Sequence, residues 1–384
     1  MFRYSLRVHP SFRWLFLFLA LHGGSVGVAQ IDPVQRRLIQ LGYNQPIEGK
    51  APLAGYAYYL HNEPGFPSED TTLRLAVAPV YLDAELGFSV NERTDWAIGL
   101  AGGGFADSYF EIRQGRLLNG ESFLGHGGGP SVSLYHRFNP DHLIPVNGIV
   151  RLGTYYSVYE RESDTAPLFV LPEDRLTAHL RTGIRVGGRE PLMFPKLGME
   201  LSGWYEGQYR ANNGTYGFND RDVEDASHLF WGRALFIYTL PNIRHNFSVN
   251  LTGGSSVDAD RFSAYRPGGV LPLASEFPLT LPGYFYKELS VTKFALLSGQ
   301  YNFPLDRMNR WSVSTVGSVA RLSYLSGFEQ PSRWQSGVGA GLGYRSLKNN
   351  WRAMVGYSYG FDAVRDHGKG AQSIGFLLQW DLAP

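Results

Sequence analysis

The chain has 384 residues, a formal net charge of +1 and no cysteine. The near-neutral charge argues against a nucleic-acid partner, because phosphate binding needs a surplus of basic residues. The absence of cysteine excludes disulfides, thiolate metal sites and a lipid-modified cysteine anchor. The chain has 46 glycines and 14% aromatic residues, and no apolar run of helix-spanning length outside its N-terminus. This composition indicates an all-β protein, either a soluble sandwich or a barrel.

Residues 1–29 have the pattern of a secretory signal peptide. Three arginines precede the apolar run WLFLFLAL at 14–21, and small residues at 27–29 predict cleavage after Ala29. The apolar run is too short to span a bilayer as an anchor. We therefore expect an exported protein. Residues 30–52 are predicted as a short periplasmic leader with a possible helical turn at 34–41, followed by a barrel domain at 53–384.

From residue 53 onward, segments of about ten residues alternate between apolar and polar, which is typical of transmembrane β-strands. In one of them Leu176, Leu180 and Ile184 share one face, and Arg181 and Arg185 share the other. A soluble sandwich would also alternate. However, aromatic residues gather near the strand ends, as in membrane-interface girdles, and charges in mid-strand need a water-filled or plugged lumen. We predict an all-β fold, a closed antiparallel transmembrane β-barrel of about 14 strands (12–16).

The predicted strands lie near 53–62, 72–90, 94–105, 127–138, 148–160, 174–188, 197–211, 228–240, 243–254, 290–304, 310–325, 334–347, 350–362 and 372–382. Their connections alternate in length. The connections predicted to be external are mostly long and lie at 63–71, 106–126, 161–173, 212–227, 255–289, 326–333 and 363–371. Short periplasmic turns and longer external loops are typical of outer-membrane barrels, so both termini are expected in the periplasm. Strand 72–90 contains Pro79, where the outward parity shifts, and we expect a bulge there.

The final strand has an apolar face made of Ile374, Phe376, Leu378, Trp380 and Leu382. A C-terminal amphipathic strand of this kind resembles the signal by which the barrel-assembly machinery recognises its clients. Many clients end on phenylalanine, whereas this chain ends in Ala383-Pro384. The expected partners are therefore the barrel-assembly machinery during biogenesis and outer-membrane lipid.

Short motifs in the last third of the chain carry a family resemblance. They are Arg266-Pro267-Gly268-Gly269, Leu281-Pro282-Gly283-Tyr284, the strand ending Gln300-Tyr301-Asn302-Phe303-Pro304-Leu305, and residues 370–382. From about Leu251 onward the chain resembles the bacterial surface antigen superfamily, which contains the BamA-type assembly barrels and the two-partner secretion translocators. The resemblance implies an outer-membrane barrel in which a loop before a comparable strand folds into the lumen. In the family that loop carries a Gly-Gly pair and an Arg-Gly-Tyr or Arg-Gly-Phe tip.

Two departures from the family pattern affect the expected function. Pro282 matches the position of the tip arginine, so the ionic anchor that this arginine makes is expected to be missing. Members that insert or secrete proteins carry periplasmic POTRA modules before the barrel, and 31–52 has no room for one. The resemblance therefore implies the barrel alone.

A set of charged residues is expected to face the lumen: Arg151, Arg175, Arg181, Arg185, Glu200, Arg210, Arg345 and Arg352. Rings of arginine would favour anions in an open pore. Alternatively, these charges pair with one another and with the inserted loop to plug the interior. We favour the plug, because charges of both signs are present and the loops are long enough to fill the lumen.

Three patterns were tested for other chemistry. The glycine run 337–343 alternates with period two and no helix signal follows, so it indicates a smooth inner strand face, which the inserted loop would approach near Gly341, and not a nucleotide loop. The histidines lack metal-ligand spacing. Ser227-His228 has no evident third partner for hydrolysis. We therefore expect no enzyme activity, metal or cofactor.

Three functions stay open from the sequence. The first is an outer-membrane barrel with a structural or transport role that handles an unknown client or solute. The second is an auxiliary factor in protein or lipid translocation. The third is a lipid-modifying enzyme.

Overall fold

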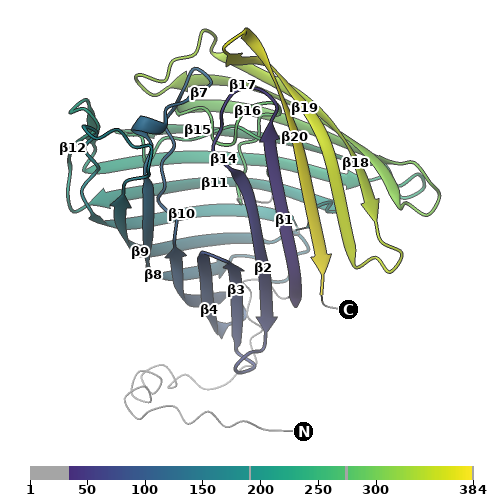
Figure 1. Cartoon of the computed structure of the whole chain (residues 1–384). Helices are drawn as coiled ribbons and strands as arrows, with labels where there is room; N and C mark the ends of the chain where they lie inside the picture. Colours follow the sequence, from purple (N-terminus) through teal and green to yellow (C-terminus); the bar gives the residue numbers. More distant parts are fainter. Residues whose placement is uncertain (1–33, 190–191, 273–275, 383–384) are drawn as a thin grey trace.

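The computed structural model describes residues 34–189, 192–272 and 276–382. Within these residues sixteen strands form one closed barrel, each antiparallel to its neighbours (Figure 1), which confirms the predicted fold class. The barrel strands are β1 (Arg36–Pro46), β2 (Ala54–Pro64), β3 (Thr71–Ala78), β4 (Tyr81–Asn91), β5 (Thr94–Gly103), β8 (Leu124–Arg137), β9 (Val146–Glu160), β10 (Arg175–Arg189), β11 (Leu197–Arg210), β14 (Ala226–Thr239), β15 (Asn246–Val257), β16 (Val291–Pro304), β17 (Trp311–Tyr324), β18 (Trp334–Arg345), β19 (Trp351–Arg365) and β20 (Gly368–Asp381). No helix among the described residues is long and apolar enough to cross a membrane. The predicted signal peptide lies outside the described residues.

The two faces of the barrel wall differ in polarity, as a membrane-spanning barrel requires. Apolar side chains such as Leu251, Val338 and Val355 are about half exposed on the outer face. Polar side chains such as Gln40 and Gln379 are buried on the inner face and bond to each other. Antiparallel pairing in a closed ring satisfies every strand's backbone groups, which a bilayer cannot do.

Aromatic side chains line the outer face near the end of the barrel that carries the short turns. The rings of Trp311 and Tyr344 lie 4.8 Å apart, and those of Tyr344 and Trp351 lie 5.3 Å apart. Trp351 pairs across the strands with Trp380. Rings gathered at one level are typical of a membrane–water interface. This level marks one edge of the bilayer.

The first strand lies where the sequence predicted a leader. β1 pairs with β2 on one side and with β20 on the other, through nine residue pairs from Leu38–Asp381 to Pro46–Ser373. The barrel therefore begins at Arg36 and not at residue 53. The physical reason is closure: without β1, the open edges of β2 and β20 would expose unpaired backbone groups to lipid.

The predicted strand 72–90 is in fact a hairpin. Ala78 pairs with Tyr81, so Pro79 and Val80 form a two-residue turn and the expected bulge is wrong. Proline has no backbone N–H to donate, and it commonly begins a tight turn. The hairpin and β1 together raise the strand number from fourteen to sixteen. They also place the connection 65–70 at the short-turn end, opposite to the prediction for 63–71.

The long connections gather at the other end of the barrel and pack together, and we call this layer the loop cap. It contains the hairpin of β6 (Ile112–Arg113) and β7 (Arg116–Leu117), the short helix η1 (Asn119–Glu121), and the hairpin of β12 (Gly214–Tyr216) and β13 (Arg221–Val223). Its core is a cluster of buried side chains from four connections: Tyr109, Phe123, Phe169, Tyr216 and Val223, with Phe262 against them. The cap covers the outer end of the lumen.

Candidate functional site: the inserted loop and the lumen

Between β15 and β16, the described residues 258–272 and 276–290 belong to a loop that lies inside the barrel (Figure 1). The Val270 N–H donates to the Asn44 side chain on β1 at 3.1 Å. The Gly283 N–H donates to Ser358 on β19 at 3.0 Å, and Tyr284 Oη donates to Gln335 on β18 at 2.7 Å. The loop thus bonds to the wall on both sides of the seam between β1 and β20. We call it the inserted loop.

Glycines allow the tip of this loop to touch the wall. Gly283 has a φ of +85°, and a Cβ there would lie 1.9 Å from the backbone nitrogen of Gly360. A Cβ on Gly337 would lie 2.1 Å from the Pro282 carbonyl oxygen. The expected close approach to the glycine run therefore occurs at Gly337. Gly341, where it was predicted, lines a cavity instead.

The Gly-Gly pair at the base of the tip is also required by geometry. Gly268 has a φ of +147°, and a Cβ there would lie 2.3 Å from the Phe285 carbonyl oxygen. Gly269 has a φ of +74° and pairs with Leu281 in an isolated bridge. The two glycines therefore let the descending and ascending halves of the loop lie side by side.

A buried ion pair anchors the loop, although the family's tip arginine is replaced by Pro282. Arg365, at the end of β19, donates from both terminal nitrogens to the Glu288 carboxylate, at 2.7 and 3.0 Å. The two side chains are 2% and 1% exposed. The Arg365 guanidinium also lies 3.7 Å from the centre of the Phe285 ring. The expected loss of an ionic anchor is thus corrected: the acid is on the loop and the cation is on the wall.

A second contact joins the loop to the far wall. The Glu276 carboxylate pairs with Arg185 and lies 3.5 Å from Arg181. The Glu276 carbonyl oxygen accepts from Arg233 at 2.8 Å. Burial acts to raise the pKa of Glu276, but Arg185 and Arg181 outweigh it and hold that pKa below its usual value.

The neighbouring Phe277 ring completes this contact. It lies 4.4 Å from the Arg233 guanidinium and 5.4 Å from the Trp204 ring centre. Cation–π contacts of this kind are attractive, and more so where water is excluded. The inserted loop is therefore attached to β10, β11 and β14 as well as to β1, β18 and β19.

The other motif residues tie the loop to the cap and the wall. Arg266 donates to the Phe110 carbonyl oxygen at 3.0 Å and lies 4.7 Å from the Tyr109 ring centre, both in the loop cap. Tyr284 is fully buried in a core of loop and wall residues that includes Leu281 and Ala363.

The predicted lumen charges fall into three groups along the barrel axis. Arg175 and Arg210 lie at the cap, where Arg210 pairs with Asp260 at 3.1 Å and Arg175 lies 4.5 Å from the Phe262 ring centre. Arg151, Arg181, Arg185 and Glu200 lie in the middle, where Arg151 pairs with Glu85 and Glu200 accepts from Arg233 at 2.5 and 3.0 Å. Arg345 and Arg352 lie at the short-turn end, directly opposite each other on β18 and β19.

Sequence reasoning missed the residues whose charges hold the inserted loop: Arg233, Glu276, Glu288 and Arg365. Arg365 was assigned to a loop, because the period-two pattern of β19 was followed only to residue 362. Glu288 and Arg365 are 77 residues apart, and no spacing pattern links them. The one available signal was the presence of acids inside an inserted loop expected to face many arginines.

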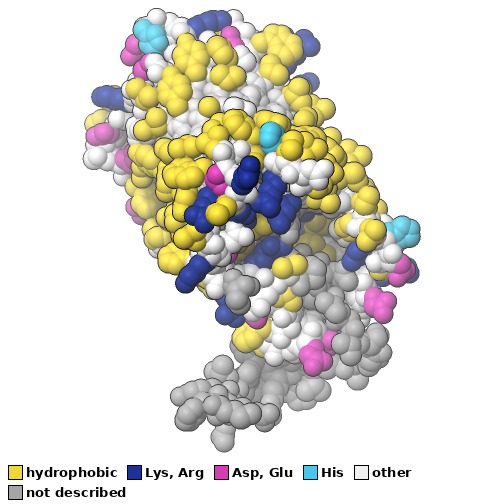
Figure 2. Space-filling model, turned by 90° about the vertical axis from the view of Figure 1, so that its right-hand side faces the viewer, with side chains coloured by type: hydrophobic (Ala, Val, Ile, Leu, Met, Phe, Trp, Pro, Cys, Tyr) yellow, Lys and Arg dark blue, Asp and Glu magenta, His cyan; other side chains and the backbone are white. Residues whose placement is uncertain are grey.

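Two cavities remain at the short-turn end of the lumen. The mouth cavity, of about 400 Å³, has five basic side chains and no acidic side chain among the described residues that line it. Figure 2 views this side of the molecule and shows lysine and arginine side chains gathered around a hollow. The basic residues of the mouth cavity are Lys196, Arg244, Arg310, Arg345 and Arg352.

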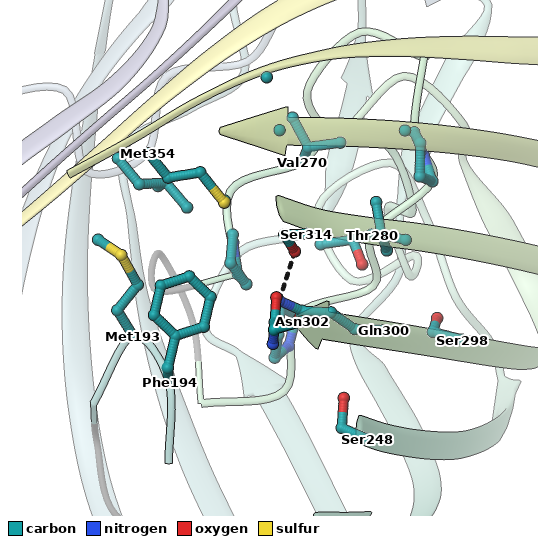
Figure 3. Close-up of a pocket in the computed structure, with 18 of the residues that line it drawn as sticks. Met193, Phe194, Ser248, Val270, Thr280, Ser298, Gln300, Asn302, Ser314 and Met354 are labelled. Carbon is teal, nitrogen blue, oxygen red and sulfur yellow. Dashed lines mark hydrogen bonds between the residues drawn. The ribbon is translucent and has the colours of Figure 1, made fainter. Parts of the chain in front are cut away.

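The inner cavity, of about 170 Å³, lies behind the mouth and against the inserted loop (Figure 3). Its surface is mostly apolar: Met193, Phe194 and Met354 lie on one side and Val270 of the loop lies above. The opposite wall carries hydroxyl and amide groups, among which Gln300 donates to Ser314 at 3.1 Å. Phe194, Asn246 and Asn302 border both cavities.

Ser227 and His228 do not form a catalytic pair. Adjacent residues of a strand point to opposite faces. Ser227 is buried inside and donates to the Asp258 carbonyl oxygen at 2.6 Å, whereas His228 bonds to the Tyr205 hydroxyl at 2.9 Å. Groups of three or more His, Asp or Glu that could hold a metal do not occur among the described residues.

Comparison with solved structures shows that other proteins have the same fold. The chain is similar to CdiB from Acinetobacter baumannii, with a TM-score of 0.60 and 11% sequence identity over 91% of this chain and 60% of that chain. It is also similar to BamA from Haemophilus ducreyi lacking POTRA domains 1–3, with a TM-score of 0.55 and 11% identity over 91% of this chain and 71% of that one. The chain thus spans 60% of the CdiB chain.

The barrel therefore has the fold of the CdiB and BamA barrels, as the sequence resemblance implied. No protein-family model matches the sequence. No curated protein matches it either.

Proposed function

We propose that this protein is an outer-membrane transport or translocation barrel whose lumen is closed by the inserted loop, and that the loop must move for passage. The observation that carries the proposal is the buried ion pair between Glu288 and Arg365. Two charges withdrawn from water cost several kcal/mol each, and close pairing offsets this cost only in part. Such a pair is weak evidence for stability alone. It is well suited to holding the inserted loop in one position, from which the loop can still be released.

The surrounding architecture supports a plug. The loop bonds to strands around the barrel, the cap covers the outer end, and the two cavities described above lie on the short-turn side of the loop. The neighbouring solved structures, CdiB and BamA, have the same kind of barrel. A static pore with anion preference is less compatible with this filling, because the mid-lumen arginines are occupied by Glu85, Glu200 and Glu276.

Conductance across a planar lipid bilayer tests the proposal. The Leu289 N–H donates to the Pro267 carbonyl oxygen at 3.1 Å, so the loop's two ends lie together and 268–288 can be replaced by two glycines. We expect wild-type protein to be almost silent and the shortened protein to give steady open-channel steps. Arg116→Ala is the control, because the Arg116–Asp366 pair is exposed and outside the lumen. Steady wild-type channels that are unchanged by the deletion would overturn the plug.

A further inference from the structure

The mouth cavity is lined by five basic side chains and, among the described residues, by no acidic side chain. Lys196, Arg244, Arg310 and Arg345 each line it, and none of these four forms an ion pair with a described carboxylate. Arg345 instead donates to the Met308 carbonyl oxygen at 2.9 Å. Like charges around one low-dielectric hollow raise the local positive potential. A ligand bearing negative charge would relieve it.

Two acidic residues near the mouth, Asp306 and Asp381, make other contacts. The Asp306 carboxylate accepts the backbone N–H groups of Met308, Arg310 and Trp311 at 2.7 to 3.2 Å. These bonds, led by that of Trp311, hold the pKa of Asp306 below its usual value. Asp381 accepts from Gln379 at 2.7 Å. Neither acid lines the mouth cavity.

Arg345 and Arg352 form a two-arginine wall at the mouth cavity. They are direct cross-strand neighbours on β18 and β19, and both line the mouth cavity. Like charges directly opposite on neighbouring strands are destabilising. Guanidinium groups bind phosphate and carboxylate in a bidentate manner, which suits a two-arginine wall.

The space behind the charges is apolar on one side. Met193, Phe194 and Met354 form that side of the inner cavity, and Val270 and Pro282 of the inserted loop close it (Figure 3). Phe194 borders both cavities, so one molecule passing this ring would touch the basic mouth and the apolar interior together. An inorganic anion would fill only the first. An acidic peptide would have to place polar backbone against the apolar side.

The mouth also lies at the level where lipid headgroups are found. Tyr344 lines it and belongs to the aromatic girdle with Trp311 and Trp351. Such girdles mark the membrane–water interface. An amphiphile in this interface would therefore meet the mouth at the height of its own head.

We propose that the short-turn end of the lumen binds an anionic amphiphile, a molecule with a phosphate or carboxylate head and an apolar chain. The head binds among Lys196, Arg244, Arg310 and Arg345, and the chain enters the inner cavity past Phe194. Because Val270 and Pro282 line that cavity, the bound chain contacts the plug directly. This inference rests on the transport function proposed above and names the class of ligand for it. The binding site itself can be tested without measuring conductance.

The test measures binding to purified full-length protein in nanodiscs of zwitterionic lipid, with short-chain phosphatidic acid as the probe. Arg310→Gln with Arg345→Gln removes two cavity charges. The matched control, Arg307→Gln with Lys348→Gln, removes two charges from the same turns that do not line the cavity. We expect the first pair to weaken binding about tenfold or more, since charge-assisted hydrogen bonds are lost, and the control pair to change it less than about twofold. Equal binding by both variants would contradict the proposal.

Three further probes separate the sources of the anion. Short-chain fatty acids should compete with phosphatidic acid for binding. Inorganic phosphate should bind at least about tenfold more weakly, because it lacks the chain that is buried in the inner cavity. Phosphate that binds as tightly would overturn the apolar half of the site. An Asp/Glu-rich peptide that displaces phosphatidic acid at a lower concentration would replace the amphiphile by a polypeptide ligand.

A photoreactive acyl chain locates the site. The chain should label Phe194 or Met354. Phe194→Ala should change the affinity for phosphatidic acid by no more than about threefold, and the labelled position should move further into the inner cavity. Labelling confined to the outer girdle would overturn the inner cavity as the chain site.

Heat-modified gel mobility checks that every variant is folded. If the wild-type protein binds phosphatidic acid as expected but the loop-deleted barrel does not conduct, only the proposed function is refuted. If the loop-deleted barrel conducts but all variants bind phosphatidic acid equally, only this inference is refuted.

Discussion

At the loop-cap end of the barrel arginines are buried against carboxylates, whereas at the short-turn end they line a cavity whose described residues include no acidic side chain. Arg365 pairs with Glu288 and Arg210 pairs with Asp260, and all four side chains are almost fully buried. Arg310 and Arg345 are only partly buried and lie beside a hollow. The same residue type therefore holds structure together at one end and is available to a ligand at the other. The difference lies in which neighbours the fold supplies.

Removing Arg365 should cause the largest loss of stability among the variants that test this difference between the two ends. Arg365→Ala leaves the Glu288 carboxylate buried without its partner, which costs about 3–5 kcal/mol. Guanidinium unfolding in lipid vesicles measures the free energy, and protease cleavage of the inserted loop shows where the loss occurs. Arg116→Ala, at an exposed pair close to Arg365 in the fold, should cost no more than about 1 kcal/mol. Equal losses from the two variants would show that burial does not distinguish these pairs.

Displacing the loop tip should have the next largest effect. Gly283→Ala forces a Cβ into the backbone of Gly360 at a positive φ, and we expect a loss of about 1–3 kcal/mol. Hydrogen exchange at 281–285 should rise, because the tip cannot stay bonded to Ser358 and Gln335. Gly214→Ala is the control, because nothing lies within 4 Å of a Cβ added there. Unchanged protection in Gly283→Ala would mean that the tip is not held by the wall.

The far-wall contact should have a smaller effect that depends on pH. Glu276→Gln removes the charge that faces Arg185 and Arg181 and should cost about 1 kcal/mol, since the carboxylate is half exposed to the lumen. The folded pKa of Glu276 lies below its usual value of 4.5, so its contribution is complete above pH 4.5 and is lost as pH falls through the folded pKa. Loop protection measured across this range should therefore decline in wild type and stay level in the variant. A decline in both proteins would assign the pH response to another group.

Removing a mouth arginine should have the smallest effect on stability. Arg345→Gln relieves repulsion with Arg352 and loses one exposed hydrogen bond to Met308, so the two changes nearly cancel within about 0.5 kcal/mol. The same unfolding assay, without added anion, measures this difference. A loss as large as that from Arg365→Ala would show that Arg345 is also structural, and the contrast between the two ends would disappear.

Particular residues show why some elements were predictable and others were not. Alternation made β10 and β19 plain, because one face must be apolar for lipid and the other polar for the lumen. In β1, Ile39, Leu41 and Tyr43 face outward and Gln40 and Asn44 face inward, so the alternation was present in the sequence. It is short, and Leu38 on the inner face interrupts it at its start. In 72–90, alternation continues on both sides of Pro79, so two short strands resembled one long strand. Conversely, the inserted loop was located by its length and by the motifs that carry the family resemblance.

By itself, the sequence determined that the chain forms a transmembrane barrel with one long connection at 255–289, because period-two polarity and connection length are local properties of the chain. The insertion of that connection into the lumen was implied by the family resemblance. Only the tertiary structure decided that sixteen strands close the ring, that Glu288 and Arg365 hold the inserted loop, and which of the described arginines pair with acids. Closure and charge pairing join residues far apart in the chain, and they depend on distances that no local pattern records.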